Sequence, residues 1–148
     1  MSKEYKFQLR NADIDYDDIN RFLMTHIEDN ENIGVIDFEV LYYDSGYFDD
    51  VYSEEEFYEL FDTDKVIYIQ TVKIFRDYRY NGYGRIMMKK FIDKYAKKFG
   101  DTLVLYADTI DNDLGIEDYE YRDTIIIKFY ESLGFIRDMN TNYMYLKI

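Results

Sequence analysis

A strand, a glycine turn, a helix and a second strand follow one another between residues 66 and 107, and this order constrains the fold more than any other part of the chain. Residues 66–75 are mostly β-branched or aromatic, which predicts a buried strand. Residues 84–99 carry apolar side chains at helical spacing and end before Gly100, a natural helix stop. Residues 103–107 predict a short second strand. Two strands joined in this way run parallel, with a right-handed crossover.

The turn of this unit, Arg79-Tyr80-Asn81-Gly82-Tyr83-Gly84, is suited to hold a phosphate. Its glycines let the backbone approach a ligand without interference from Cβ atoms. The first amides of the following helix have no partner within that helix, and the helix dipole adds partial positive charge there. Arg79, Arg85, Lys89 and Lys90 add full positive charges. We therefore expect a di- or polyphosphate ligand, although a G-x-G before a helix is weak when taken alone.

Outside this unit the sequence predicts four more strands and three more helices. Alternating or β-branched runs indicate strands over residues 5–9, 33–43, 135–137 and 143–147, the last two as a closing hairpin. Capping residues and helical spacing indicate helices over residues 13–27, 54–61 and 123–133. Ser53 and Glu56 give the second of these a capping box, and Gly134 ends the third. Residues 108–122 are expected to form an acidic loop.

Length and composition predict one domain that packing alone holds together. The 148 residues suffice for one core and are too few for two ordinary ones, so residues 1–148 are expected to form a single domain. Tyrosine (18) and phenylalanine (11) supply much of the apolar area. Cysteine is absent, which excludes disulfides and cysteine-based zinc sites. Residues 1–4 lack a signal-peptide pattern and no run could span a bilayer, so a soluble cytoplasmic protein is expected.

Charge is distributed unevenly along the chain. The formal net charge of −13 argues against nucleic acid or an anionic membrane as the main partner. Residues 73–98 hold nine basic residues and two acids, whereas residues 44–64 hold nine acids and no Lys or Arg. Acidic stretches are often no more than solvated faces. Their alternative role here is to attract a cationic substrate, beside a basic lane that suits an anionic cofactor.

Two separated segments resemble the GNAT N-acetyltransferase superfamily. The first, residues 72–84, is similar to that family's strand and Q/R-x-x-G-x-G/A turn, with Arg79, Gly82 and Gly84 at the fixed positions. The second, Phe129-Tyr130-Glu131-Ser132-Leu133-Gly134-Phe135, is similar to its later helix, which ends Y-E-x-x-G-F. Their order and spacing also agree. The resemblance implies an α/β chain of the α+β type, with a mixed, mostly antiparallel sheet, a splayed parallel pair of strands and flanking helices.

The same resemblance implies acetyl-coenzyme A as the cofactor. The amides of the turn would bind its pyrophosphate, at the positions Arg79, Tyr80, Asn81, Gly82, Tyr83, Gly84 and Arg85. The preceding strand would lend main-chain groups to the pantetheine arm from Val72 and Ile74. The thioester would lie in the gap between this strand and the strand over residues 103–107.

Tyr130 corresponds to the tyrosine that GNAT enzymes commonly use to protonate the leaving thiolate. A phenol, with a reference pKa of about 10, is protonated at neutral pH and can act in this way. The amine would attack the thioester directly, and a main-chain amide near Ile74 would stabilise the oxyanion. Tyr130 also falls on the inward face of its helix, so packing is an alternative role. Asp108 is the nearest candidate for the general base, and a turn residue is the alternative there.

The sequence departs from the family pattern at two cofactor positions. Tyr80 stands where many members have another glycine, and Asp123 stands where many carry an asparagine that contacts the cofactor. His26 is the only histidine and is placed on the helix over residues 13–27, where a packing role outweighs catalysis. A Ser/His/Asp triad is therefore not expected, and we predict no metal site.

The predicted function is acetyl-coenzyme A-dependent N-acetylation of a cationic substrate, either a small amine, a polyamine, or a lysine or N-terminus of a basic protein. We expect no direct contact with nucleic acid or membranes, and a monomer or homodimer. An alternative is a catalytically weak or inactive acidic interaction module, a decoy for a nucleic-acid-binding protein. The basic residues of 73–98 favour the enzyme, because neither a DNA mimic nor a purely structural domain needs them.

Overall fold

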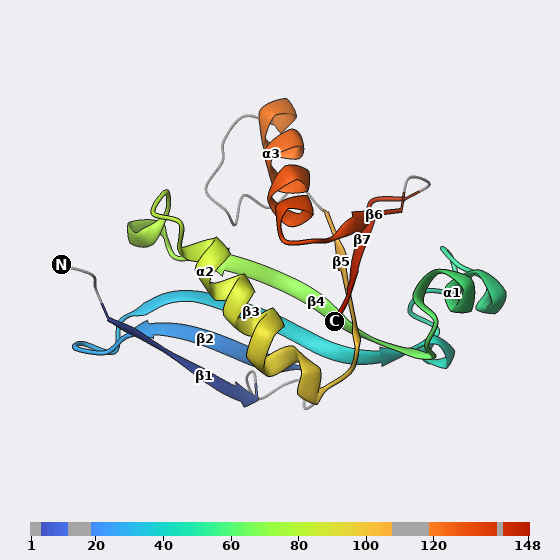
Figure 1. Ribbon diagram of the computed structural model, residues 1–148, viewed down its shortest axis with the longest axis horizontal. Helices are drawn as coiled ribbons and strands as arrows, with labels where there is room; N and C mark the ends of the chain where they lie inside the picture. Colours follow the sequence, from blue (N-terminus) through green and yellow to red (C-terminus); the bar gives the residue numbers. More distant parts are fainter. Residues whose placement is uncertain (1–3, 12–18, 108–118, 139–140) are drawn as a thin grey trace.

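A seven-stranded sheet runs through the structure in the order β1-β2-β3-β4-β5-β7-β6. The computed structural model describes residues 4–11, 19–107, 119–138 and 141–148 (Figure 1). The strands are β1 (Tyr5–Asn11), β2 (Asn20–His26), β3 (Asn32–Tyr42), β4 (Lys65–Ile74), β5 (Thr102–Tyr106), β6 (Ile136–Arg137) and β7 (Tyr143–Lys147). Neighbouring strands are antiparallel except β4 and β5, which run parallel. The sheet is thus mixed and mostly antiparallel, as the family resemblance implies.

Within the described residues, three α-helices accompany the sheet: α1 (Glu54–Phe61), α2 (Tyr83–Lys90) and α3 (Tyr119–Ser132). Helix α2 lies across one face, and α1 lies at one end of the molecule (Figure 1). The helical path of α2 continues through a π-helical turn, η3 (Phe91–Tyr95), and a 3-10 turn, η4 (Ala96–Lys98). The helix predicted over residues 84–99 is therefore confirmed, and its internal π turn is a feature that periodicity does not reveal.

Helix α1 begins at the predicted capping box. The Ser53 hydroxyl accepts a hydrogen bond from the Glu56 amide at 3.1 Å, and the Glu56 carboxylate accepts one from the Ser53 amide at 3.1 Å. These two bonds satisfy amides that the helix itself cannot pair. Phe57 and Phe61 then face inward and are buried.

Two groups of buried side chains lie on opposite faces of the sheet. The larger group packs under α2 and α3 and includes Phe22, Phe38, Phe91 and Ile126. The smaller joins aromatic residues from the segment between β3 and β4 to one side of β4, β5 and β7, and consists of Phe48, Tyr52, Phe57, Phe61, Val66, Tyr68, Val104 and Tyr143. Since side chains alternate along a strand, β4 and β5 contribute to both groups and join them.

The helix predicted over residues 13–27 is wrong where the structure describes that segment, because residues 20–26 form β2. Phe22, Leu23 and Met24 are consecutive and all buried. A buried run of this kind fits a helix face as well as a strand, and pairing with both β1 and β3 decides the outcome. His26 consequently lies on β2, where it is buried with its ring centroid 5.1 Å from that of Tyr78.

The C-terminal part agrees with the sequence except at one boundary. Helix α3 begins at Tyr119, four residues before the predicted start, so the acidic loop expected over 108–122 is wrong for residues 119–122. Residues 108–118 lie outside the described residues. Gly134 follows α3 with φ of 102°, a left-handed conformation that favours glycine. Strands β6 and β7 pair antiparallel, which confirms the closing hairpin.

The close packing of β3 against β4 and α2 can be tested at Gly34. A Cβ atom on Gly34 would lie 2.7 Å from Ile74 Cδ1, 2.9 Å from Met87 Sδ and 3.0 Å from the Lys73 carbonyl oxygen. Gly34→Ala should therefore lower the free energy of unfolding by about 1–3 kcal/mol in urea denaturation. Gly100→Ala is the control, since its Cβ would meet nothing closer than 3.4 Å. Equal stability of the two variants would contradict the packing described here.

Candidate active site

Strand β4 changes its pairing halfway along, and this change opens the sheet. Its first half pairs with β5 at three positions only, the last being Ile69 with Leu105. On the other side, Asp37 pairs with Thr71 and Phe38 pairs with Ile69, which leaves Gln70 as an extra residue on β4. Such a β-bulge bends a strand and increases its twist. Beyond the bulge β4 continues along β3 without β5, which gives the predicted splayed parallel pair.

The bulge also changes which residues of β4 direct their main-chain groups towards β3 and which direct them away from it. The Phe75 amide donates to the Ile33 carbonyl at 2.9 Å, so these two residues form a hydrogen-bonded pair between β3 and β4. In an antiparallel pair such positions alternate with non-bonded ones, and Ile74 and Val72 occupy the latter. The main-chain groups of Val72 and Ile74 are therefore directed away from β3, into the gap that β5 has left. This is the orientation that the predicted cofactor role requires.

The turn after β4 is built from two residues in the left-handed conformation. Gly82 has φ of 78°, and Tyr80 has φ of 66°, which is uncommon for a residue with a side chain. Tyr80 therefore replaces the usual glycine without changing the glycine-like backbone, and its side chain is 81% exposed. A Cβ on Gly82 would meet nothing within 4 Å, so the space beside the turn is open there.

The amides at the start of α2 are oriented for an anion. The first hydrogen bond of the helix runs from the Ile86 amide to the Gly82 carbonyl. The helix thus provides no acceptor for the amides of Tyr83, Gly84 and Arg85. Asn81 stabilises the turn, because its side-chain amide donates a hydrogen bond to the Arg79 carbonyl at 2.9 Å.

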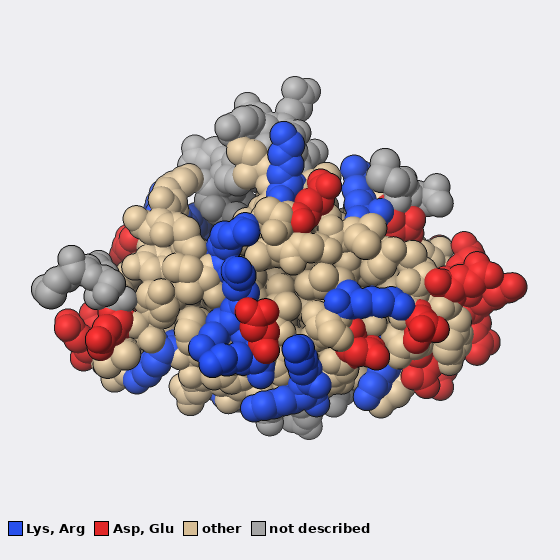
Figure 2. Space-filling view, viewed as in Figure 1, with Lys and Arg blue, Asp and Glu red and all other residues tan. Residues whose placement is uncertain are grey.

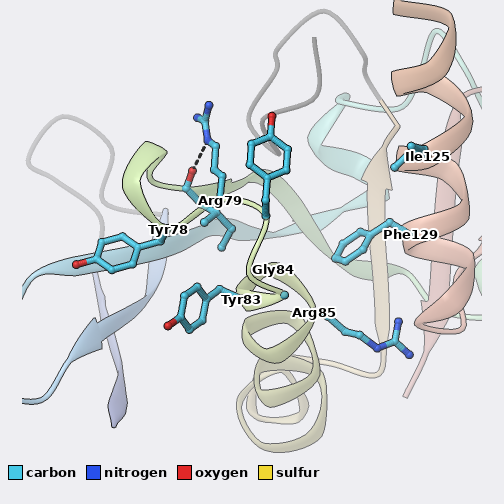
Figure 3. Close-up of a pocket in the computed structure, with 10 residues that line it drawn as sticks. Tyr78, Arg79, Tyr83, Gly84, Arg85, Ile125 and Phe129 are labelled. Carbon is cyan, nitrogen blue, oxygen red and sulfur yellow. Dashed lines mark hydrogen bonds between the residues drawn. The ribbon is translucent and has the colours of Figure 1, made fainter. Parts of the chain in front are cut away.

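A cavity of about 280 Å³ lies between this turn and α3 (Figure 3). Seven of the nine predicted cofactor residues line it: Ile74, Arg79, Tyr80, Gly82, Tyr83, Gly84 and Arg85. Val72 and Asn81 do not. Three further residues line the cavity without having been predicted from the sequence: Tyr78, Ile125 and Phe129. The ring of Phe129 points from α3 towards the turn (Figure 3).

Two arginines have defined places at this cavity. Arg79 Nε donates to the Ile74 carbonyl oxygen at 2.8 Å, which fixes the guanidinium beside the end of β4 (Figure 3). Arg85 Nη1 donates to the Ser132 hydroxyl at 2.6 Å, and that hydroxyl donates to the Phe129 carbonyl at 2.6 Å. Arg85 therefore ties the first turn of α2 to the last turn of α3, and its guanidinium is directed towards α3 (Figure 3).

Tyr78 lines the cavity, but its hydroxyl is already committed. Desolvation by burial, and then a hydrogen bond to Glu31, raises the pKa of Tyr78 to about 12. The phenol is thus neutral at physiological pH and is oriented towards Glu31. This makes Tyr78 a part of the cavity wall and a poor candidate for a proton donor.

Tyr130 is not among the residues that line the cavity. Tyr130 is buried on the inward face of α3, with ring centroids 5.2 Å from Phe129 and 5.7 Å from Phe135. Asp108 lies outside the described residues, and so does the side chain of Asp123. Their roles stay predictions.

Charge follows the elements as the sequence indicates. Lysine and arginine side chains run in a stripe over α2, and acids gather at the end of the molecule where α1 lies (Figure 2). The pKa of Lys90 is lowered, chiefly by Lys94 and then by desolvation, as expected where cations crowd together. Within the described ranges, no group of three or more His, Asp or Glu side chains is placed to hold a metal ion. None of the described helices has the length and apolar character to cross a membrane.

Comparison with known proteins agrees with this geometry. Residues 2–135 match the acetyltransferase (GNAT) family. Among solved structures, a bacterial toxin is similar over 99% of this chain and 92% of its own, with a TM-score of 0.62 and 14% identity. NAA60 of Arabidopsis thaliana, solved with acetyl-CoA, is similar over 88% of this chain and 77% of its own (TM-score 0.56, 13% identity).

Arylalkylamine N-acetyltransferase 2 from Aedes aegypti is similar over 86% of this chain and 70% of its own, with a TM-score of 0.53 and 15% identity. At these identities the structures show a shared fold. No curated protein matches the chain in sequence. The family match covers nearly the whole chain and includes the strand, the turn and the helices that form the cavity, so this chain belongs to the acetyltransferase (GNAT) family.

Proposed function

We propose that this chain transfers the acetyl group of acetyl-coenzyme A to a primary amine. The observation that carries the proposal is the cavity at the start of α2, where unpaired amides, an open glycine position and two arginines lie beside the gap between β4 and β5. NAA60, which has the same fold, was solved with acetyl-CoA. Family membership and this arrangement point to the same cosubstrate.

The residues present fit the diphosphate of coenzyme A. The amides of Tyr83, Gly84 and Arg85 would hold it, because a helix N-terminus combines open donors with a positive dipole end. Arg85, which also lines the cavity, would add a full positive charge to its wall. Val72 and Ile74 would pair their gap-facing main-chain groups with the amides of the pantetheine arm. The bound cosubstrate supplies an acetyl group already activated as a thioester.

The chain itself would contribute three chemical tasks. A main-chain amide of β4 near Ile74 would donate to the carbonyl oxygen on which negative charge develops, at no cost of reorganisation because the strand holds it in place. Tyr130 would donate a proton to the departing sulfur. Asp108 would take the proton of the amine, directly or through water. These roles rest on the family resemblance.

We further propose that the acceptor is cationic. Nine acids and no Lys or Arg lie in residues 44–64, which include η1 (Tyr43–Ser45) in part and α1 entirely. A field of this sign attracts an ammonium group and repels phosphate-rich partners. We do not propose an inactive interaction module, because such a module would not need the cavity beside α2.

Binding of the cosubstrate can be tested at Gly84, the second residue of α2 and part of the cavity wall. Gly84→Trp should fill the cavity and weaken acetyl-coenzyme A binding by at least about tenfold in titration calorimetry, as expected from the loss of a few diphosphate contacts. Ile86→Trp is the matched control, since Ile86 lies on the same helix, is 36% exposed and does not line the cavity.

Wild-type protein should also show a higher melting temperature with acetyl-coenzyme A and no shift with adenosine alone. If neither compound shifts the melting temperature, the interaction module becomes the better explanation. Unchanged affinity in a folded Gly84→Trp protein would mean that the diphosphate binds elsewhere.

The proton donor can be tested with Tyr130→Phe. Removing one hydroxyl should lower kcat by about 10²–10⁴-fold, the usual contribution of general acid catalysis. Because Tyr130 does not line the cavity, the Kd for acetyl-coenzyme A should not change. Release of free thiol over a pH series measures both the loss of rate and the loss of any alkaline limb. A kcat equal to that of the wild type would remove Tyr130 from the mechanism.

A further inference from the structure

Four tyrosines lie together on the sheet face opposite α2, and we name them the tyrosine patch: Tyr47, Tyr68, Tyr106 and Tyr143. The ring centroids of Tyr47 and Tyr68 are 5.0 Å apart, and those of Tyr106 and Tyr143 are 5.2 Å apart. Phe48 lies between the two pairs, 6.0 Å from Tyr68 and 5.8 Å from Tyr143. The proposed function uses none of these side chains.

The patch borders the gap between β4 and β5. Leu105 is the last residue of β5 that pairs with β4, and Tyr106 is the next residue. Leu103 and Leu105 belong to the core on the α2 side, and Val104 belongs to the core on the opposite side. Since side chains alternate along a strand, Tyr106 lies on the face of Val104. Ile74, which lines the cofactor cavity, belongs to the α2 side. The cavity and the patch therefore approach one gap from opposite faces.

The patch combines an exposed layer with a buried support. Tyr47 and Tyr106 are 48% and 43% exposed, whereas Tyr68 and Tyr143 are buried beneath them. Tyr68 shares a hydrogen bond with Tyr47, and the Tyr106 hydroxyl accepts one from the Asn142 side-chain amide at 3.1 Å. Burial raises the pKa of both Tyr68 and Tyr143, so the supporting rings are neutral phenols. The exposed rings are held in place before any ligand arrives, which lowers the entropic cost of binding.

The surroundings of the patch favour a positively charged ligand. Tyr47 lies within residues 44–64, which carry nine acids and no Lys or Arg. Glu39, the partner of Tyr68 across the sheet, adds to this field. Aromatic faces attract ammonium groups through the ring quadrupole, and their apolar surface also takes up methylene groups. A ligand that suits both features carries a cation on an apolar stem.

We propose that the tyrosine patch binds the acceptor of acetyl transfer and selects a primary alkylammonium on an unbranched apolar stem, the chemistry shared by a lysine side chain and a free alkylamine. This inference rests on the proposed function and names its acceptor. An amine on the patch would meet the thioester from the face opposite the coenzyme. Asp108, the proposed base, follows Tyr106 by two residues in the sequence.

The test compares Tyr47→Leu and Tyr106→Leu, which keep apolar volume and remove the ring. With pentylamine as acceptor, each variant should raise KM by about tenfold, with kcat within about twofold of the wild type, as expected for the loss of one cation–aromatic contact. Tyr106→Phe, which keeps the ring, should restore the wild-type KM. Tyr58→Leu is the matched control, because Tyr58 is 43% exposed in the same acidic segment and lies outside the patch.

Direct binding separates failure of this inference from failure of the proposed function. Titration of the protein with pentylamine, pentanol, tert-butylamine or Nα-acetyl-lysine N-methylamide, followed by chemical shifts, measures binding without turnover. Pentylamine should bind and perturb Tyr47 and Tyr106 signals, while pentanol and tert-butylamine should bind at least about tenfold more weakly. Binding of the lysine derivative in preference to pentylamine would identify a protein acceptor, and the reverse a free amine.

Equal affinities for pentylamine in wild type and both leucine variants would overturn the inference, whether or not acetyl-coenzyme A binds. If the wild-type protein binds the amine but does not bind acetyl-coenzyme A, the proposed function alone would be contradicted.

Discussion

Everything at this site depends on the single extra residue in β4. Gln70 has no opposite residue in the register of β3, although its side-chain amide donates to the Glu39 carboxylate at 2.6 Å, and the pairing of β4 with β5 ends one residue before it. Main-chain groups that lose a strand partner need another, because an unpaired buried amide or carbonyl is costly. One such group, the Ile74 carbonyl, is satisfied by Arg79 Nε. The gap therefore leaves main-chain groups of β4 without the strand partner that a regular sheet would provide. A ligand with amides of its own can form hydrogen bonds with these groups.

The same segment stores backbone strain directly after this gap. Tyr80 holds a left-handed conformation that costs a residue with a side chain of the order of 1 kcal/mol or more. The strain is offset by contacts on both sides, namely the Asn81 side chain on the Arg79 carbonyl and the bond between Arg79 and Ile74. Arg79 is therefore part of the scaffold as well as of the cavity wall. A residue that the motif predicts to contact phosphate thus also stabilises the turn in which the phosphate contacts would form.

Local signals explain which parts of the structure the sequence predicts. Strand β4, the turn and α2 are each determined by residues close in the chain, and so is the capping box at Ser53. The sequence does not predict strand β2, because Phe22, Leu23 and Met24 form a continuous buried run, whose period does not distinguish a helix from a strand with two partners. Phe129 and Ile125 reach the cavity only through the packing of α3, which no local pattern encodes. Phe129 lines the cavity while its neighbour Tyr130 faces the core, a distinction of one residue that needs the helix phase to be known.

Charge separation would let one gap serve the two proposed ligands, which have opposite sign. The basic stripe on α2 and the acidic residues around α1 occupy different parts of the surface, although the chain has a net charge of −13 (Figure 2). At physiological ionic strength a field decays over about 8 Å, so each group of charges acts mainly on what lies beside it. An anionic cofactor at the start of α2 is therefore little repelled by the distant acids, and an ammonium at the tyrosine patch is little repelled by the lysines. If the same charges were mixed evenly over the surface, the excess of acids would oppose diphosphate binding at every site. Their placement on separate elements therefore makes an acidic chain compatible with a polyphosphate cosubstrate.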